Sequence, residues 1–190
     1  YSVFFFLMVR RQPRSPLFPY PALFRSGAML CTRQIYEAIE GGSGFFQHGH
    51  TYIGHPVATA AGLAVANQML ERDLIARCAA MGERLQSALE DRFGQHAHVG
   101  DIRGRGLFRG IELVQDRDSK APFDPARGLA AKIKKAAFEA GLICYPMSGT
   151  RDGRNGDHIL LAPPFIISDD QITEVIDKLE TAINASLPQG

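Results

Sequence analysis

Two hydrophobic periods alternate along residues 96–190, and this alternation most constrains the fold. Residues 107–114 carry Leu107, Ile111 and Leu113 on one side, which predicts a half-buried strand. Residues 126–140 and 168–183 instead repeat apolar side chains three and four positions apart, which predicts helices. Two further short strands are predicted at 142–145 and 158–161. Strand, helix, strand, strand and helix in this order predict a small α+β domain.

The final helix has the most complete set of signals. Ser168 is a good N-cap, Gln171 completes a capping box, and Ile167 and Ile172 are placed for a hydrophobic staple. Gly141 is expected to close the preceding helix in the left-handed conformation. The side chains expected to be buried on the final helix are Ile172, Val175, Ile176, Leu179 and Ile183.

Residues 27–95 are predicted to be mostly helical. A short strand at 28–31 leads into a helical turn at 34–39, and a loop rich in glycine and histidine follows. Pro56 suits the first turn of a helix that is small and apolar nearly all round, which predicts burial on every side. A second helix is expected after Asp73, with an apolar stripe of Ile75, Cys78, Gly82, Leu85 and Leu89. A domain boundary is expected at 93–99.

Residues 1–26 differ in kind from the rest. Pro13, Pro16, Pro19 and Pro21 exclude a regular helix or a central strand there. The apolar run before Arg10 has its arginines after it rather than before it, so a secretory signal is disfavoured. The phrases FFFLMVRRQPRS and LFPYPALFRS resemble the translated read-through of a sequencing adapter. We therefore expect an artefactual extension, and a natural disordered one is the alternative.

Charge and cysteine content exclude several classes of protein. The chain has 21 Lys and Arg residues against 20 Asp and Glu, so it lacks the basic field that would favour nucleic acid. Cys31, Cys78 and Cys144 are odd in number and far apart, which argues against a disulfide framework and favours a reducing, cytoplasmic compartment. No run approaches the roughly 18 apolar residues that a membrane span requires.

The loop HGHTYIGHPVATAAG at 48–62 runs into the start of a helix. Free backbone N–H groups there, together with the hydroxyls of Thr51 and Tyr52, suit an anion because the helix dipole also favours negative charge. An ordinary helix start with glycines for turn geometry explains the same residues. The histidines at 48, 50 and 55 have no carboxylate or thiolate at matching spacing, so no metal site is expected.

Two other segments invite functional interpretations. The glycines at 104, 106 and 110 are spaced GxGxxxG and enter a strand, so they do not form a dinucleotide fingerprint, and a tight turn or close backbone approach explains the first two. The loop at 149–158 holds Arg154, whose planar guanidinium could bind a substrate carboxylate. A solvated charged loop explains the same composition. Nothing supplies a nucleophile for a hydrolytic triad.

Four sequence segments, in the order in which the family has them, resemble the class III aminotransferases that depend on pyridoxal phosphate. They are GAMLCTRQIYEAI, GHTYIGHPVATAAGLAV, VGDIRGRGLFRGIELV and DGRNGDHILLAPPFIIS, and they extend from Gly27 towards the end of the chain. The resemblance implies the C-terminal part of an α/β, fold type I enzyme, in which residues 27–95 finish the large cofactor-binding domain and 96–190 form the small α+β domain. It also implies transamination between an amino-acid or amine donor and a keto-acid acceptor, in a homodimer whose subunits share each site.

The resemblance assigns roles to four residues. Thr51 matches the threonine that contacts the phosphate of the neighbouring subunit's cofactor, and Tyr52 is assigned to cofactor binding beside it. Arg154 falls near the arginine that engages a substrate carboxylate in some members, in a loop that varies in length. His50 is assigned to the substrate side, at the entrance.

This chain departs from the family pattern at the lysine that holds the cofactor as a Schiff base. That lysine lies shortly before the Gly-Ala of GAMLC in the family, whereas this chain has RSPLFPYPALFRS there. The lysines of this chain, expected in a loop or on solvated helix faces, are Lys120, Lys132, Lys134, Lys135 and Lys178. We therefore expect no catalytic residue and no activity from the chain alone. A racemase or aminomutase of the same fold and a non-catalytic α+β binding module are the alternatives.

Overall fold

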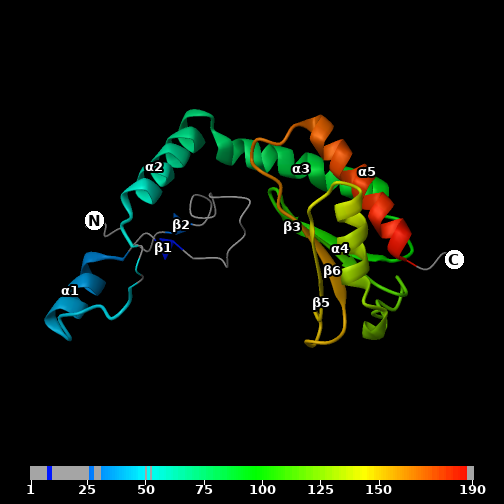
Figure 1. Cartoon of the computed structure of the whole chain (residues 1–190), viewed down its shortest axis with the longest axis horizontal. Coiled ribbons are helices and arrows are strands. Elements are labelled where there is room, and N and C mark those ends of the chain that lie inside the picture. Colours follow the sequence, from blue (N-terminus) through cyan, green and yellow to red (C-terminus); the bar gives the residue numbers. More distant parts are fainter. Residues whose placement is uncertain (1–7, 10–25, 28–30, 50, 52, 188–190) are drawn as a thin grey trace. The chain divides into compact units, whose positions relative to one another are not determined.

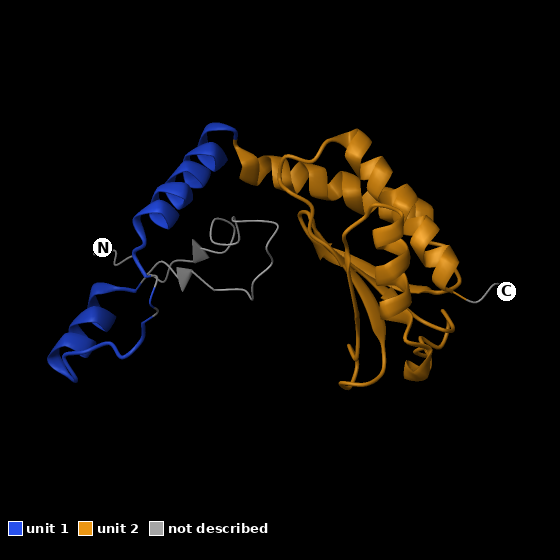
Figure 2. Cartoon of the chain, viewed as in Figure 1, with its two compact units in different colours: residues 1–72 blue, residues 73–190 orange. Residues whose placement is uncertain are grey.

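The structure is a computed structural model that describes residues 8–9, 26–27, 31–49, 51 and 53–187 (Figure 1). The chain divides into two compact units, 1–72 and 73–190 (Figure 2). Across the described ranges, no helix combines the length and the apolar character needed to cross a membrane. Most of the extension expected at 1–26 and the strand expected at 28–31, Cys31 excepted, lie outside the described residues.

The described residues of the first unit form a pair of two-residue strands and two helices. Strand β1 (Met8–Val9) pairs antiparallel with β2 (Ser26–Gly27), and the helices are α1 (Arg33–Gly41) and α2 (Pro56–Glu71). Helix α1 begins where the side chain of Thr32 accepts the backbone N–H of Ile35. This helix confirms the helical turn predicted at 34–39, and Pro56 lies in the first turn of α2 as predicted.

The prediction that α2 is buried is wrong for the described chain. Only Ala58 is buried, whereas Val57, Leu63 and Leu70 are 65%, 63% and 80% exposed. A helix that is apolar all round is buried only where other elements cover it on several sides. Among the described residues of this unit, no element provides such cover.

The second unit is a four-stranded antiparallel sheet with helices on one face (Figure 1). Its strands, in the spatial order β3-β4-β6-β5, are β3 (Val99–Arg105), β4 (Phe108–Leu113), β6 (Asp157–Leu161) and β5 (Tyr145–Ser148). Its helices are α3 (Leu74–Phe93), the 3-10 turn η1 (Pro125–Arg127), α4 (Leu129–Glu139) and α5 (Asp169–Ser186). Ile111 and Ile159 are opposite each other in the register and fully buried under the helices. This arrangement confirms the predicted α+β unit.

Two predicted elements of this unit differ in their bounds, and one strand was not predicted. Strand β3 was not predicted, and Gly104, which lies within it, was assigned to a tight turn or a close backbone approach. The strand predicted at 142–145 begins at Tyr145, because Leu142 still donates its N–H to Ala137 O and closes the end of α4. The helix predicted at 126–140 is interrupted at Gly128, whose φ of 58° lies in the left-handed region.

Helix α5 matches its sequence signals closely. Ser168 Oγ accepts the Gln171 N–H at 3.3 Å, while Gln171 Oε1 accepts the Ser168 N–H at 3.0 Å, so both halves of the capping box are present. Ile167 and Ile172 are both buried, as the predicted staple requires. Of the predicted stripe, Val175 is only partly buried, and the structure adds Ala182.

Helix α3 belongs to the second unit, because it packs on α5 and β3. The compact units therefore divide between Arg72 and Asp73 in this chain, whereas the domain boundary predicted near residue 95 concerns the whole enzyme and stays a prediction. On α3, Leu85 and Leu89 are fully buried as predicted, but Ile75 is 62% exposed. Its neighbour Leu74 is buried instead.

Two glycines fix the contact between α3 and the β3–β4 turn. A Cβ added to Gly82 would lie 2.3–2.5 Å from backbone atoms of Gly106, closer than any real contact. Gly106 itself has a φ of 54°, which favours glycine. The prediction of a tight turn or a close backbone approach at Gly104 and Gly106 is confirmed, since a Cβ at Gly104 would clash with Phe108 O.

Two histidines occupy the connection between α3 and β3. His96 Nδ1 accepts the backbone N–H of His98 at 3.1 Å, so this nitrogen carries no proton. The two rings are 6.0 Å apart. Burial, and then the proximity of His98, lower the pKa of His96 below its ordinary value of 6.5. The folded unit therefore favours neutral His96.

Acidification below pH 6.5 should weaken the second unit through His96. The unfolded chain has the higher pKa and binds the proton first, so the free energy of unfolding falls as pH falls through the unfolded value. The loss is complete once the pH is below the folded pKa. Urea unfolding across this pH range should show a steeper loss for the wild type than for His96→Gln. Equal slopes would contradict the expectation.

Candidate functional site

The loop before α2 presents a hydroxyl and unpaired amides. Thr51 is exposed, and its side chain has no hydrogen-bond partner among the described residues. His55 caps α2 without a side-chain hydrogen bond, and Thr59 donates its N–H to His55 O at 2.9 Å. The N–H groups of Val57 and Ala58 therefore have no partner in the described part of the chain. This end of α2 has donors to offer to an anion.

These groups fit the phosphate of a cofactor such as pyridoxal phosphate. A helix of 16 residues directs its positive dipole end and its free amides at the same place. Ala58 is only 4% exposed, and a buried unpaired N–H is costly unless a ligand or water satisfies it. The exposed hydroxyl of Thr51 adds a donor of the kind that phosphate oxygens accept.

Two of the four predicted site residues, His50 and Tyr52, lie outside the described residues. The other two, Thr51 and Arg154, belong to different compact units, and each is considered within its own unit. His48 and His55 flank these two positions, and both have interaction partners.

The lysines all lie in the second unit, since residues 1–119 contain none. Lys120 Nζ donates to Gly100 O at 2.7 Å, and Lys178 Nζ contacts Glu174 at 2.5 Å. The remaining three lie on the exposed surface of α4. Their positions agree with the prediction of a loop and solvated helix faces.

Arg154 lies in a closed loop that joins β5 to β6. Gly149 and Thr150 donate their N–H groups to Gly156 O at 2.7 and 3.2 Å, and Arg151 donates to Asn155 O at 2.9 Å. At the base of the loop, Ser148 Oγ donates to Asp157 Oδ1 at 2.6 Å. The loop is therefore internally bonded at both its base and its tip.

Asp152 fixes the tip of this loop. Its Oδ1 accepts the N–H groups of Arg154 at 2.9 Å and Asn155 at 2.7 Å, and its Oδ2 accepts Asn155 Nδ2 at 2.7 Å. These hydrogen bonds, the Asn155 backbone first, lower the pKa of Asp152 to about 2. The backbone of Arg154 is thus held, while its exposed guanidinium has no hydrogen-bond partner among the described residues.

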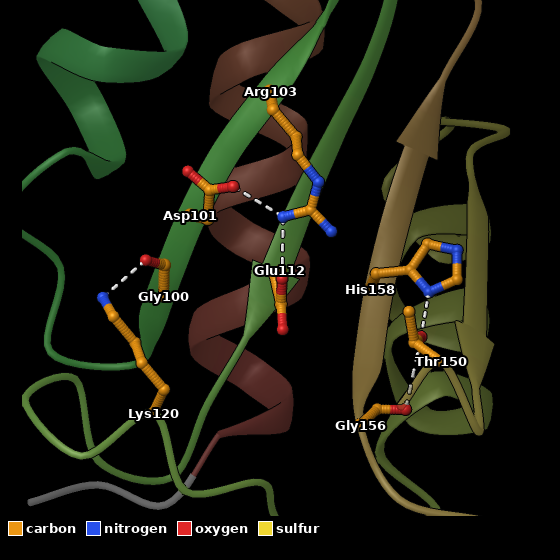
Figure 3. Close-up of polar contacts among 8 residues, drawn as sticks. All are labelled: Gly100, Asp101, Arg103, Glu112, Lys120, Thr150, Gly156 and His158. Carbon is orange, nitrogen blue, oxygen red and sulfur yellow. Dashed lines mark hydrogen bonds and ion pairs between the residues drawn. The ribbon is translucent and has the colours of Figure 1, made fainter. Parts of the chain in front are cut away.

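A hollow of about 350 Å³ lies on the sheet face that the helices leave open. In it Arg103 Nη1 donates to Asp101 at 2.6 Å and to Glu112 at 2.7 Å (Figure 3). These bonds raise the pKa of Arg103. Across the hollow, Thr150 Oγ1 bonds to His158 Nδ1 and joins the sheet to the Arg154 loop (Figure 3). Because these groups satisfy one another, the hollow carries no catalytic assignment.

The sequence interpretation missed this hollow, although one residue could have indicated it. Gly110 lies in the middle of β4, between Arg103 on β3 and Leu160 on β6. A glycine inside a strand weakens it and often marks a place where something approaches closely. The missing side chain of Gly110 leaves the floor of the hollow open.

Metal and redox sites are not indicated by the geometry. Within the described ranges, no group of three or more His, Cys, Asp or Glu side chains could hold a metal ion. All three cysteines are free, and burial raises the pKa of the Cys144 thiol.

The aminotransferase class-III family profile matches residues 23–183. An aminotransferase of Gibberella zeae is 39% identical over 161 residues, which are 84% of this chain and 32% of that protein. A leucine/methionine racemase of Thermococcus litoralis is 35% identical over 143 residues, or 75% of this chain and 30% of that protein. The chain thus spans about a third of the length of these relatives.

The chain also resembles part of solved transaminase structures. A Bacillus anthracis aminotransferase superposes with a TM-score of 0.73 at 40% identity, covering 84% of this chain and 35% of that one. An amine transaminase from an uncultivated Pseudomonas species, solved with pyridoxal phosphate bound, gives 0.71 at 35% identity and covers 85% and 35%. The fold is that of part of an α/β, fold type I transaminase, and the chain belongs to the class III aminotransferase family.

Proposed function

We propose that this chain is the C-terminal part of an enzyme that transfers an amino group from an amino acid or amine to a keto acid with pyridoxal phosphate. The observation that supports it most is the start of α2, where the free Thr51 hydroxyl and the unpaired amides of Val57 and Ala58 match an anion site. The family match supports pyridoxal phosphate as the ligand of this site, because a structurally similar amine transaminase was solved with pyridoxal phosphate bound.

In this proposal each functional residue has a stated role. Thr51 binds the cofactor phosphate of a neighbouring subunit in a homodimer, Tyr52 contacts the cofactor at the entrance, and the cofactor when bound supplies the electron sink. Arg154 binds a substrate carboxylate through its planar guanidinium, and His50 lines the substrate side. The internally bonded loop supports the role of Arg154, since it limits the entropy lost on binding. The proposed compartment is the cytoplasm.

The chain alone is proposed to be catalytically incompetent. No lysine precedes residue 120, so none stands near the family's cofactor-holding position. The large domain that the relatives possess is represented only by residues 27–95 in this interpretation.

A racemase is the second candidate for the whole enzyme, because a leucine/methionine racemase is 35% identical to this chain. Keto-acid formation separates the two, since racemisation inverts the amino acid without producing a keto acid. A non-catalytic α+β binding module is the third candidate, and the absence of lysine before residue 120 favours it.

The phosphate site can be tested on the chain itself by substituting Thr51. We expect the dissociation constant for inorganic phosphate, followed through the amide signals of Val57 and Ala58, to rise about tenfold in Thr51→Val, the equivalent of one hydrogen bond to a charged group. Thr59→Val is the matched control, because the Thr59 hydroxyl already donates to His55 O at 3.1 Å. Equal affinities in both variants would contradict a role for Thr51.

A further inference from the structure

Residues 155 and 156 form the chain's only Asn–Gly pair. In such a pair the second residue is glycine, so no Cβ hinders its backbone nitrogen when it approaches the side-chain amide of the asparagine. Asn67 and Asn184, the two other asparagines, are followed by Gln68 and Ala185, whose side chains obstruct that approach.

The loop leaves the backbone nitrogen of Gly156 available as a nucleophile. The N–H of Gly156 donates no hydrogen bond to any described residue, although Gly156 is buried. Unpaired N–H groups of this kind are rare. Asn155 is half-buried, and water can reach the loop tip because the four residues before it are exposed.

We propose that Asn155 is a deamidation site and that its conversion opens the loop that holds Arg154. The Gly156 nitrogen attacks Cγ of Asn155, so that an N–Cγ bond forms and the Cγ–Nδ2 bond breaks. Ammonia leaves with the proton from the Gly156 nitrogen. Water then opens the five-membered ring and yields aspartate or isoaspartate. No oxidant or reductant is required.

The consequence follows from the bonds that Asn155 makes. It supplies two of the three hydrogen bonds that Asp152 accepts, one from its backbone and one from Nδ2. Aspartate would replace the donor at Nδ2 by a second carboxylate beside Asp152, and like charges at that separation repel. Isoaspartate would also lengthen the backbone next to Arg154. The effect on substrate binding rests on the function proposed for Arg154, whereas the deamidation itself does not.

Peptide mass spectrometry on aged protein tests the chemistry. The folded chain is incubated at mildly alkaline pH until Asn155 in a parallel unfolded sample is fully converted. We expect the folded chain to exchange the amide for a carboxyl at Asn155 while Asn67 and Asn184 remain intact. An unmodified Asn155 in the folded chain, or equal conversion of all three asparagines, would overturn the proposal.

Hydrogen exchange tests the opening of the loop separately from any enzymatic activity. In Asn155→Asp, protection of the Arg154 amide should fall about tenfold, the loss expected when a hydrogen bond of about 1.4 kcal/mol is removed. Asn67→Asp, which adds the same charge on the exposed surface of α2, is the control and should leave Arg154 unchanged. Unchanged protection in Asn155→Asp would show that the loop does not depend on this amide.

Discussion

The purified chain, mixed with pyridoxal phosphate, an amino donor and a keto acid, should form keto product no faster than free pyridoxal phosphate does. Residues 1–119 contain no lysine, and the five that follow lie in the second unit, where Lys120 and Lys178 are bonded to Gly100 O and Glu174. A positioned acid–base group contributes about 10²–10⁴-fold to the rate, so loss of the family's lysine removes at least that factor.

An intact relative provides the positive control for this assay. The aminotransferase of Bacillus anthracis, 40% identical over the shared region, should produce keto acid under the same conditions. Borohydride reduction followed by mass spectrometry should locate the cofactor on one lysine of that enzyme and on no specific lysine of this chain. Turnover by this chain above that of the cofactor alone would contradict the expectation.

Gly82→Ala should destabilise the second unit by about 3 kcal/mol or more, at or above the upper end of the range for overpacking a core. Its new Cβ would lie 2.3–2.5 Å from the backbone of Gly106, which cannot rotate away as a side chain can. The gain in helix propensity from glycine to alanine, about 1 kcal/mol, is too small to offset this clash.

Gly110→Ala is the matched control for this stability prediction. A Cβ at Gly110 would meet its nearest atom, Leu160 Cδ2, at 3.4 Å, and that side chain can move. Urea unfolding followed by circular dichroism should therefore show a change below about 1 kcal/mol for Gly110→Ala. Similar losses in the two variants would contradict the steric role of Gly82.

Local signals in the sequence predicted the second unit well. The capping box of Ser168 and Gln171 and the alternation of Leu107, Ile111 and Leu113 depend on neighbouring residues, so they can be recognised without the fold. The start of β5 could not be predicted, because Leu142 is used by the end of α4 rather than by the sheet. Strand β3 was missed because its glycines are explained only by their contacts with other elements.

The candidate site was predictable only in part. The segment around Thr51 was compatible with an anion site or with an ordinary helix start, and the structure identifies Val57 and Ala58 as the residues whose amides are unpaired. The hydrogen bonds around Asp152 could not be inferred from composition, because they depend on how the loop folds back on itself. Similarly, the burial predicted for α2 depended on neighbours that the described residues do not supply.

Sequencing the native gene and its transcript upstream of codon 27 tests most directly whether this chain is part of a larger transaminase. We expect the frame to continue into a large domain, with a lysine shortly before Gly27 in place of the adapter-like residues. A transcript that encodes residues 1–26 as they stand, with no upstream frame carrying such a lysine, would contradict it.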